Sequence, residues 1–218
     1  MILFNWKANG TKALLDEINQ LNIQNESISL FVPLHLANTV DTKKFQIGTQ
    51  NVSIFENGAY TGEISAQMLA EIGVKYCIVG HSERRHYLDE TNEIIAKKIE
   101  NLTKHGITPV LCIGENSLDR ANKQEFIVLK NQMSVFTKNC IVAYEPVWAI
   151  GTGCIPQNHE IDDVVSWLKN EYGVANVLYG GSVSSKNIET IAKTKANGVL
   201  VGAASLKPME VLEISKYF

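Results

Sequence analysis

The chain has 218 residues, of which 45% are apolar, and a formal net charge of −3 at pH 7. This length suits one large domain or two small ones. The mild acidity argues against nucleic-acid binding, which needs clustered Lys and Arg. No apolar run reaches the roughly 18 residues of a membrane span, and the N-terminal MILFNWKANG does not resemble a secretory leader, so we expect a cytoplasmic protein with no membrane partner.

Short apolar segments alternate with segments of helical periodicity along the whole chain. The expected strands are Met1–Trp6, Ile28–Val32, Phe45–Thr49, Tyr76–Gly80, Ile107–Ile113, Cys140–Glu145, Asn176–Tyr179 and Gly198–Val201. The expected helices are Lys12–Leu21, Leu34–Thr42, Ile64–Ile72, Thr91–His105, Leu118–Phe136, Ile161–Tyr172, Ser184–Lys193 and Lys207–Tyr217. Glycine directly follows three of these helices, at Gly73, Gly106 and Gly173, as is typical of helix ends.

Strands that alternate with helices predict a parallel sheet, and eight such repeats predict a closed (β/α)8 barrel. No linker of biased composition divides the chain, so we expect a single barrel domain over residues 1–218. The alternative is a doubly wound open sheet. It is less favoured because no Gly-rich dinucleotide turn follows the first strand.

The four cysteines lie far apart and form no CxxC pair. Cys77, Cys112 and Cys140 fall in apolar segments, where a free cysteine behaves as a small hydrophobic residue. We therefore expect a reducing compartment. The sequence contains no HExxH motif or Cys/His cluster, so we expect no metal site.

Polar residues stand where several predicted strands end. Asn5 and Lys7 end the first strand, His81 and Glu83 follow the fourth, and Glu145 ends the sixth. In a (β/α)8 barrel the chemistry lies at the carboxyl ends of the strands, so these side chains are candidates for one active site.

Two short glycine-rich turns follow the last two strands. The seventh strand leads into Gly180-Gly181-Ser182, and the eighth leads into Gly202-Ala203. Such turns present backbone N–H groups and the positive end of a helix dipole to an anion. Because the fold places phosphate after strands seven and eight, these turns predict a phosphate site.

These segments also carry a family resemblance. The segments NWKAN (Asn5–Asn9), GHSERR (Gly80–Arg85), AYEPVWAIGTG (Ala143–Gly153), YGGSV (Tyr179–Val183) and GVLVGAASL (Gly198–Leu206) resemble triosephosphate isomerases, in that family's order. NGAYTGEIS (Asn57–Ser65) and LCIGE (Leu111–Glu115) match as well, so the resemblance covers the whole chain. It implies a cofactor-free isomerase of glycolysis and gluconeogenesis. This enzyme would act as a homodimer and interconvert dihydroxyacetone phosphate and D-glyceraldehyde 3-phosphate.

The resemblance implies a role for each polar residue. Glu145 would be the base that moves a proton between adjacent carbons, and a neutral His81 would polarise the carbonyl oxygens. Lys7 would supply a fixed positive charge to the substrate and the enediolate, with Asn5 positioning Lys7 and contacting the substrate. Glu83 would orient Lys7, although an ion pair of Glu83 with Arg84 or Arg85 is a close alternative.

Other residues would support the substrate. Ser82 suits a helix start beside His81, and the backbone of Gly202 and Ala203 would hold the phosphate together with Ser182. The segment after Glu145 would form a lid that excludes water, with the N–H of Gly151 on the phosphate.

Two positions depart from the family pattern. The lid ends in Cys154-Ile155-Pro156, where the family commonly has a lysine followed by small residues, and a proline restricts the backbone there. Ala203 replaces the second glycine of the last turn. Its N–H can still donate if its φ is negative, so we expect phosphate binding to survive.

Three other functions fit parts of the pattern. A metal-dependent aldolase would need several histidines at strand ends, and only His81 qualifies. A Schiff-base aldolase would need a lysine where the sixth strand ends in Glu145. A non-catalytic phosphate-binding barrel would keep the glycines but would not need His81, Glu145 and Lys7 together.

The longest strand-to-helix connection, Asn51–Gly62, carries Phe55 and Tyr60, which are unusual in a solvated loop. We expect this loop to dock into a second subunit near its Asn5 and Lys7, with Thr61 at the contact. The alternative is a loop that folds onto its own barrel.

Overall fold

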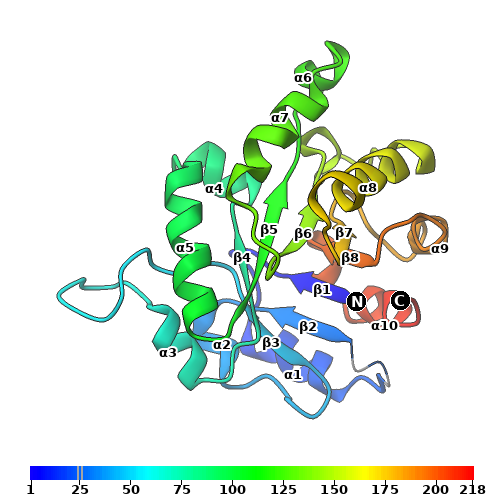
Figure 1. The fold of residues 1–218 in the computed structure, drawn as a ribbon. Helices are drawn as coiled ribbons and strands as arrows, with labels where there is room; N and C mark the ends of the chain where they lie inside the picture. The colour runs from blue at the N-terminus through cyan, green and yellow to red at the C-terminus, as the bar shows by residue number, and fades with distance from the viewer. Residues whose placement is uncertain (24, 26) are drawn as a thin grey trace.

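The computed structural model describes residues 1–23, 25 and 27–218, and in them eight parallel strands close into a barrel (Figure 1). Neighbouring strands follow chain order, and β8 pairs with β1 with Ile2 opposite Val199. This pairing excludes the open sheet and confirms the predicted (β/α)8 barrel. The strands are β1 (Ile2–Asn5), β2 (Ile28–Phe31), β3 (Gln46–Thr49), β4 (Tyr76–Val79), β5 (Thr108–Ile113), β6 (Ile141–Tyr144), β7 (Val177–Tyr179) and β8 (Gly198–Val201).

Helices surround the barrel between successive strands (Figure 1). Side-chain caps fix several helix starts, because the hydroxyls of Thr11, Ser65 and Thr91 each accept a first-turn N–H. No helix in the described residues combines the length and apolar character that crossing a bilayer requires. The α-helices are α1 (Lys12–Gln20), α2 (Leu34–Ala37), α3 (Ala66–Glu71), α4 (Ser82–Tyr87), α5 (Asn92–Lys104), α6 (Ser117–Ala121), α7 (Glu125–Gln132), α8 (Asn158–Tyr172), α9 (Ile188–Ile191) and α10 (Pro208–Ile214).

Some predicted helices differ from the observed ones. The predicted helix Leu118–Phe136 is divided into α6, α7 and the 3-10 helix η1 (Met133–Val135), because Lys123 adopts a left-handed φ of 57° that a continuous helix excludes. The predicted helix over 184–193 is shorter. The observed helix is α9, which begins only at Ile188. The Asn187 side chain accepts the N–H of Ser184 and holds the residues before α9 in a turn.

The predicted helix over 34–42 is also short and ends at Ala37 in α2. A helix start at Ser82 was expected, and α4 begins there directly after His81, although none of the predicted helix ranges covered it.

The apolar core has two layers. One cluster contains residues of the strands only and fills the barrel interior, and the other joins the opposite strand faces to the helices. Leu3 and Ala143 belong to the interior cluster. Because side chains alternate along a strand, Asn5 and Glu145 lie two residues further along the same face, at the carboxyl ends of β1 and β6. The strand period therefore places both polar side chains at the top of the barrel interior.

Candidate active site

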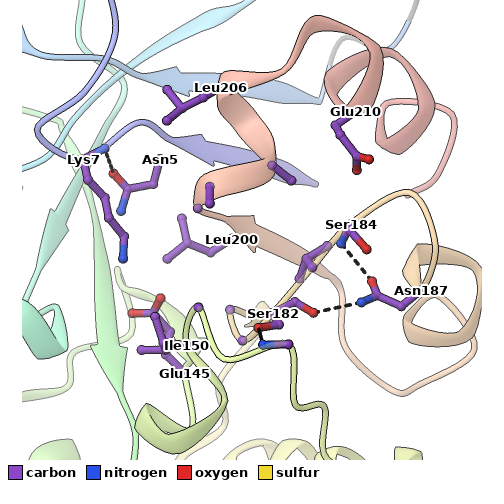
Figure 2. A pocket seen from close by; sticks show the side chains of 18 of the residues that line it. Asn5, Lys7, Glu145, Ile150, Ser182, Ser184, Asn187, Leu200, Leu206 and Glu210 are labelled. Atoms are coloured by element: carbon purple, nitrogen blue, oxygen red, sulfur yellow. Dashed lines mark hydrogen bonds between the residues drawn. The ribbon is translucent and has the colours of Figure 1, made fainter.

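A cavity of about 780 Å³ opens at the carboxyl ends of β1, β6, β7 and β8 (Figure 2). It is lined by the polar strand ends and by both glycine-rich turns. Most of the residues selected from the sequence therefore meet in one cavity, namely Asn5, Lys7, Glu145, Gly151, Ser182, Gly202 and Ala203.

Glu145 has little freedom to move away from the cavity. Its N–H donates to the carbonyl of Ile113 at 2.7 Å, and the side chain is 5% exposed. Glycines flank it on both sides: a Cβ on Gly180 would lie 2.5 Å from the Glu145 Cγ, and a Cβ on Gly114 would lie 1.8 Å from its carbonyl oxygen. Oε2 has no hydrogen-bond partner within the described residues. This carboxylate oxygen is therefore a buried acceptor open to a substrate proton.

His81 is held as a hydrogen-bond donor toward this carboxylate. The N–H of Glu83 donates to His81 Nδ1 at 3.2 Å, so Nδ1 acts as an acceptor and Nε2 is the ring nitrogen that is left to donate. His81 Nε2 lies 3.6 Å from Glu145 Oε1 and has no hydrogen bond of its own in the described part of the chain. The N-cap position of α4 thus orients an imidazole N–H beside Glu145.

Lys7 is fixed by its backbone and by Glu83. It adopts a left-handed φ of 54°, and its N–H donates to Asn5 Oδ1 at 3.0 Å. A non-glycine residue in this region carries strain of the kind found at functional sites. Lys7 Nζ forms an ion pair with Glu83.

The arginines that were alternative partners for Glu83 are engaged elsewhere. Arg84 pairs with Glu90, with its Nε 2.6 Å from Glu90 Oε2, and Arg85 donates to the carbonyl of Gly80. Both assignments agree with Glu83 as the partner of Lys7.

The two glycine-rich turns lie at the ends of β7 and β8, as the sequence indicates. Ala203 begins the 3-10 helix η3 (Ala203–Leu206) and does not have a positive φ. The first N–H groups of such a helix have no partner inside it. Ala203 therefore meets the condition of a negative φ that the sequence analysis required, and its N–H can still donate to an anion.

The lid after Glu145 is docked at both its near end and its tip. Trp148 Nε1 donates to Glu115 Oε1 at 3.0 Å. Ser182 Oγ donates to the carbonyl of Ala149 at 2.7 Å and accepts the N–H of Gly153 at 3.1 Å. The lid therefore rests on the serine of the first phosphate turn. At its far end Pro156 is buried, and the Cys154 side chain is exposed.

Glu115 links the lid to the barrel, a role that the sequence did not reveal. It is fully buried and accepts from the Tyr144 hydroxyl at 3.2 Å and from Arg120 Nη1 at 3.3 Å, in addition to Trp148. Burial, with a further contribution from the charge of Glu115, raises the pKa of Tyr144, so its hydroxyl stays a donor. The available signal in the sequence was an acid two residues beyond the end of a strand, in the LCIGE segment.

Cys112 lies in the barrel interior and lines a second cavity together with Glu145. Burial and then the negative charge of Glu145 raise the pKa of the Cys112 thiol well above its usual range, so the thiol stays neutral. In the described part of the chain, no group of three or more His, Cys, Asp or Glu side chains is arranged to hold a metal ion.

Comparison with known proteins gives one consistent family. The family model described as triosephosphate isomerase matches residues 1–218. The triosephosphate isomerase of Alkaliphilus oremlandii is 38% identical, with 100% of this chain and 98% of the relative aligned. That of Mesomycoplasma hyorhinis is 41% identical over 95% of this chain and 93% of the relative. That of a Nostoc species is 38% identical over 100% of this chain and 98% of the relative.

Proposed function

The chain belongs to the triosephosphate isomerase family and is an isomerase, and from this premise we propose that Glu145, His81 and Lys7 perform its proton transfers. The substrates are dihydroxyacetone phosphate and D-glyceraldehyde 3-phosphate, and the reaction belongs to glycolysis and, in reverse, to gluconeogenesis. No cofactor is needed, because proton transfer between adjacent carbons requires only a base, an electrophile and a bound substrate.

The chemistry begins at Glu145. Its carboxylate removes a proton from C1 of dihydroxyacetone phosphate, and the C–H electron pair becomes the C1–C2 double bond of an enediolate. The carbonyl oxygen on C2 takes the negative charge, which the Nε2–H of His81 and the ammonium of Lys7 stabilise. A proton is exchanged between the two oxygens through His81, and Glu145 returns its proton to C2. The product is D-glyceraldehyde 3-phosphate, with no net gain or loss of protons.

One observation supports this assignment most directly. The imidazole donor of His81 lies 3.6 Å from the carboxylate of Glu145, and neither His81 Nε2 nor Glu145 Oε2 has a partner in the described residues. Unsatisfied buried polar groups are costly. Glu145 lines the cavity and His81 Nε2 lies beside its carboxylate, so this pair favours a substrate that completes their hydrogen bonds.

The phosphate has its own place in the proposal. The backbone N–H groups of Gly202 and Ala203 hold it on one side, Ser182 on another, and Gly151 from the lid. Closure of the lid then excludes water from the enediolate, and opening releases the product.

A coupled assay with dihydroxyacetone phosphate in the presence of a chelator tests the function. We expect full isomerase activity without added metal. Activity that required a divalent cation would favour a metal-dependent aldolase-type enzyme. The absence of any turnover, with phosphate still bound, would favour a non-catalytic phosphate-binding barrel.

The proposed assembly is a homodimer. The connection between β3 and α3 projects from the barrel (cyan in Figure 1), and its Phe55 and Tyr60 rings stack at 4.0 Å while 39% and 44% exposed. Thr61 is exposed on the same loop. Exposed apolar rings on a projecting loop favour docking into a second copy, near that copy's Asn5 and Lys7. The cytoplasmic location also stays a prediction from the sequence.

A further inference from the structure

A carboxylate that the proposed mechanism does not use lines the phosphate cavity. Glu210 is the third residue of α10 and faces the same cavity as Ser182, Gly202 and Ala203. A free carboxylate there would repel a phosphate dianion. If phosphate binds in this cavity, we expect Glu210 to make a favourable contribution to binding that outweighs this repulsion.

Both oxygens of Glu210 are engaged by one residue of the loop between β7 and α9. The N–H of Ser185 donates to Oε2 at 2.7 Å, and the Ser185 hydroxyl donates to Oε1 at 2.9 Å. Hydrogen bonds to a charged acceptor are the stronger ones, and two of them fix the orientation of the side chain. Glu210 thus ties α10 to the loop that carries the first phosphate turn.

The same loop is braced by Asn187. Its Oδ1 accepts the N–H of Ser184 at 2.9 Å, and its Nδ2 donates to the carbonyl of Ser182 at 3.0 Å. Figure 2 shows Glu210 on the α10 side of the cavity and Ser182, Ser184 and Asn187 along the facing loop. Because Ser182 Oγ also contacts the lid at Ala149, polar contacts extend from this loop to the lid.

On its other side, α10 is joined to the second phosphate turn. The 3-10 helix η3 begins in that turn and leads directly into α10. Ser205 closes η3 on the turn, with its N–H at 2.8 Å and its hydroxyl at 2.6 Å from the carbonyl of Gly202. The contact between Glu210 and Ser185 therefore bridges the segments that follow β8 and β7.

We propose that Glu210 is a positioning residue that, through Ser185 and together with Asn187, sets the spacing of the two phosphate turns. The inference rests on the proposed function, because it takes these turns as the site of the substrate phosphate. Glu210 does not touch the phosphate. It holds the turn of Ser182 against the turn of Gly202 and Ala203. The correct spacing favours phosphate binding by more than the charge of Glu210 opposes it.

Three variants of α10 separate positioning from charge. Glu210→Met removes both acceptors at similar side-chain length. Glu210→Gln keeps the bridge, because its amide oxygen accepts the Ser185 N–H and its amide N–H donates to the Ser185 hydroxyl. Glu213→Met is the matched control. It also removes a carboxylate from α10, but the ion-pair partner of Glu213 is the exposed Lys216.

The readouts are the KM for dihydroxyacetone phosphate and the Kd of inorganic phosphate, measured by a phosphorus NMR titration that needs no turnover. For Glu210→Met we expect both to rise about fivefold to tenfold. This is only part of what the two charge-assisted hydrogen bonds to Ser185 contribute, because their loss reaches the phosphate only through the spacing of the turns. Glu210→Gln and Glu213→Met should stay within about twofold of the parent. Ser185→Ala, which removes one of the two bonds, should raise both constants about threefold.

Unchanged or lower KM and Kd in a folded Glu210→Met would overturn the inference, because loss of a repelling charge would then be the only effect. A lower unfolding temperature with unchanged KM and Kd would likewise reduce Glu210 to a structural role. If Glu210→Met does not fold, Ser185→Ala decides by the same two constants. A parent chain that binds phosphate but does not isomerise the substrate would refute the proposed function while leaving the phosphate measurement to test the spacing.

Discussion

Adding a single methyl group to Gly180 should displace the base while leaving the fold intact. A Cβ at this position would lie 2.5 Å from Cγ and 3.0 Å from Oε1 of Glu145. Carbon atoms in contact lie about 3.5–4.0 Å apart, so Glu145 must move by about 1 Å. Misplacement of a reacting group by about 1 Å can lower the rate by about 100-fold. Gly180 does not have a left-handed φ, so the alanine backbone itself is not strained.

We therefore expect Gly180→Ala to lower kcat about 100-fold in the coupled isomerase assay, with a much smaller change in KM. Gly173→Ala is the control. It lies at a helix end with a φ of 65°, has nothing within 4 Å of an added Cβ, and should cost about 1 kcal/mol of stability without lowering kcat. A folded Gly180→Ala enzyme with kcat within about threefold of the parent would refute the claim that this glycine sets the position of the base.

Three further predictions concern the lid, the dimer and acid stability. Deleting the lid tip, residues 149–152, should lower isomerase turnover and raise the ratio of methylglyoxal to isomerised product. The lid is expected to hold the phosphate C–O bond in the enediolate plane, where elimination is slow, and an unchanged ratio by NMR would contradict this. Thr61→Arg should be a monomer in analytical ultracentrifugation and should have low activity in the isomerase assay. A fully active dimer would exclude Thr61 from the contact. Burial alone would raise the pKa of Glu90, but hydrogen bonds and charge from Lys98 and then Arg84 outweigh it and lower that pKa. Glu90 therefore stabilises the fold above its ordinary pKa of 4.5, and this stabilisation is lost as the pH falls through the lower folded pKa. Glu90→Gln should accordingly be less stable at neutral pH and less sensitive to acid in urea unfolding, and parallel pH profiles for the two proteins would contradict the assignment.

The fold could be predicted from the sequence because its signal is local and repeated. Each strand is a short apolar segment followed by a helical pattern, and the closure of β8 on β1 needs only the count of repeats. The positions of Asn5 and Glu145 also follow from strand alternation, since each lies two residues beyond an interior residue. The family and the isomerase class are confirmed by the comparisons, whereas the roles of individual residues stay predictions.

Other features depend on residues that are distant in sequence. The Glu210–Ser185 bridge joins positions 25 residues apart, and the contact of Glu115 with Trp148 joins positions 33 apart. No local pattern specifies such partners. The break at Lys123 was missed for a different reason: helical periodicity continues across it, while one left-handed residue is enough to end α6.

If Glu145 carries the proton between the two carbons, its replacement should stop the exchange of substrate hydrogen with deuterated water. Dihydroxyacetone phosphate is incubated in D2O with the parent chain or with Glu145→Gln, and deuterium at C1 is followed by NMR. An amide is nearly isosteric with the carboxylate but cannot act as a base, so the substrate should still bind. We predict rapid exchange with the parent and loss of exchange by at least about 100-fold in Glu145→Gln. Exchange at a near-parental rate in that variant would show that another group removes the proton.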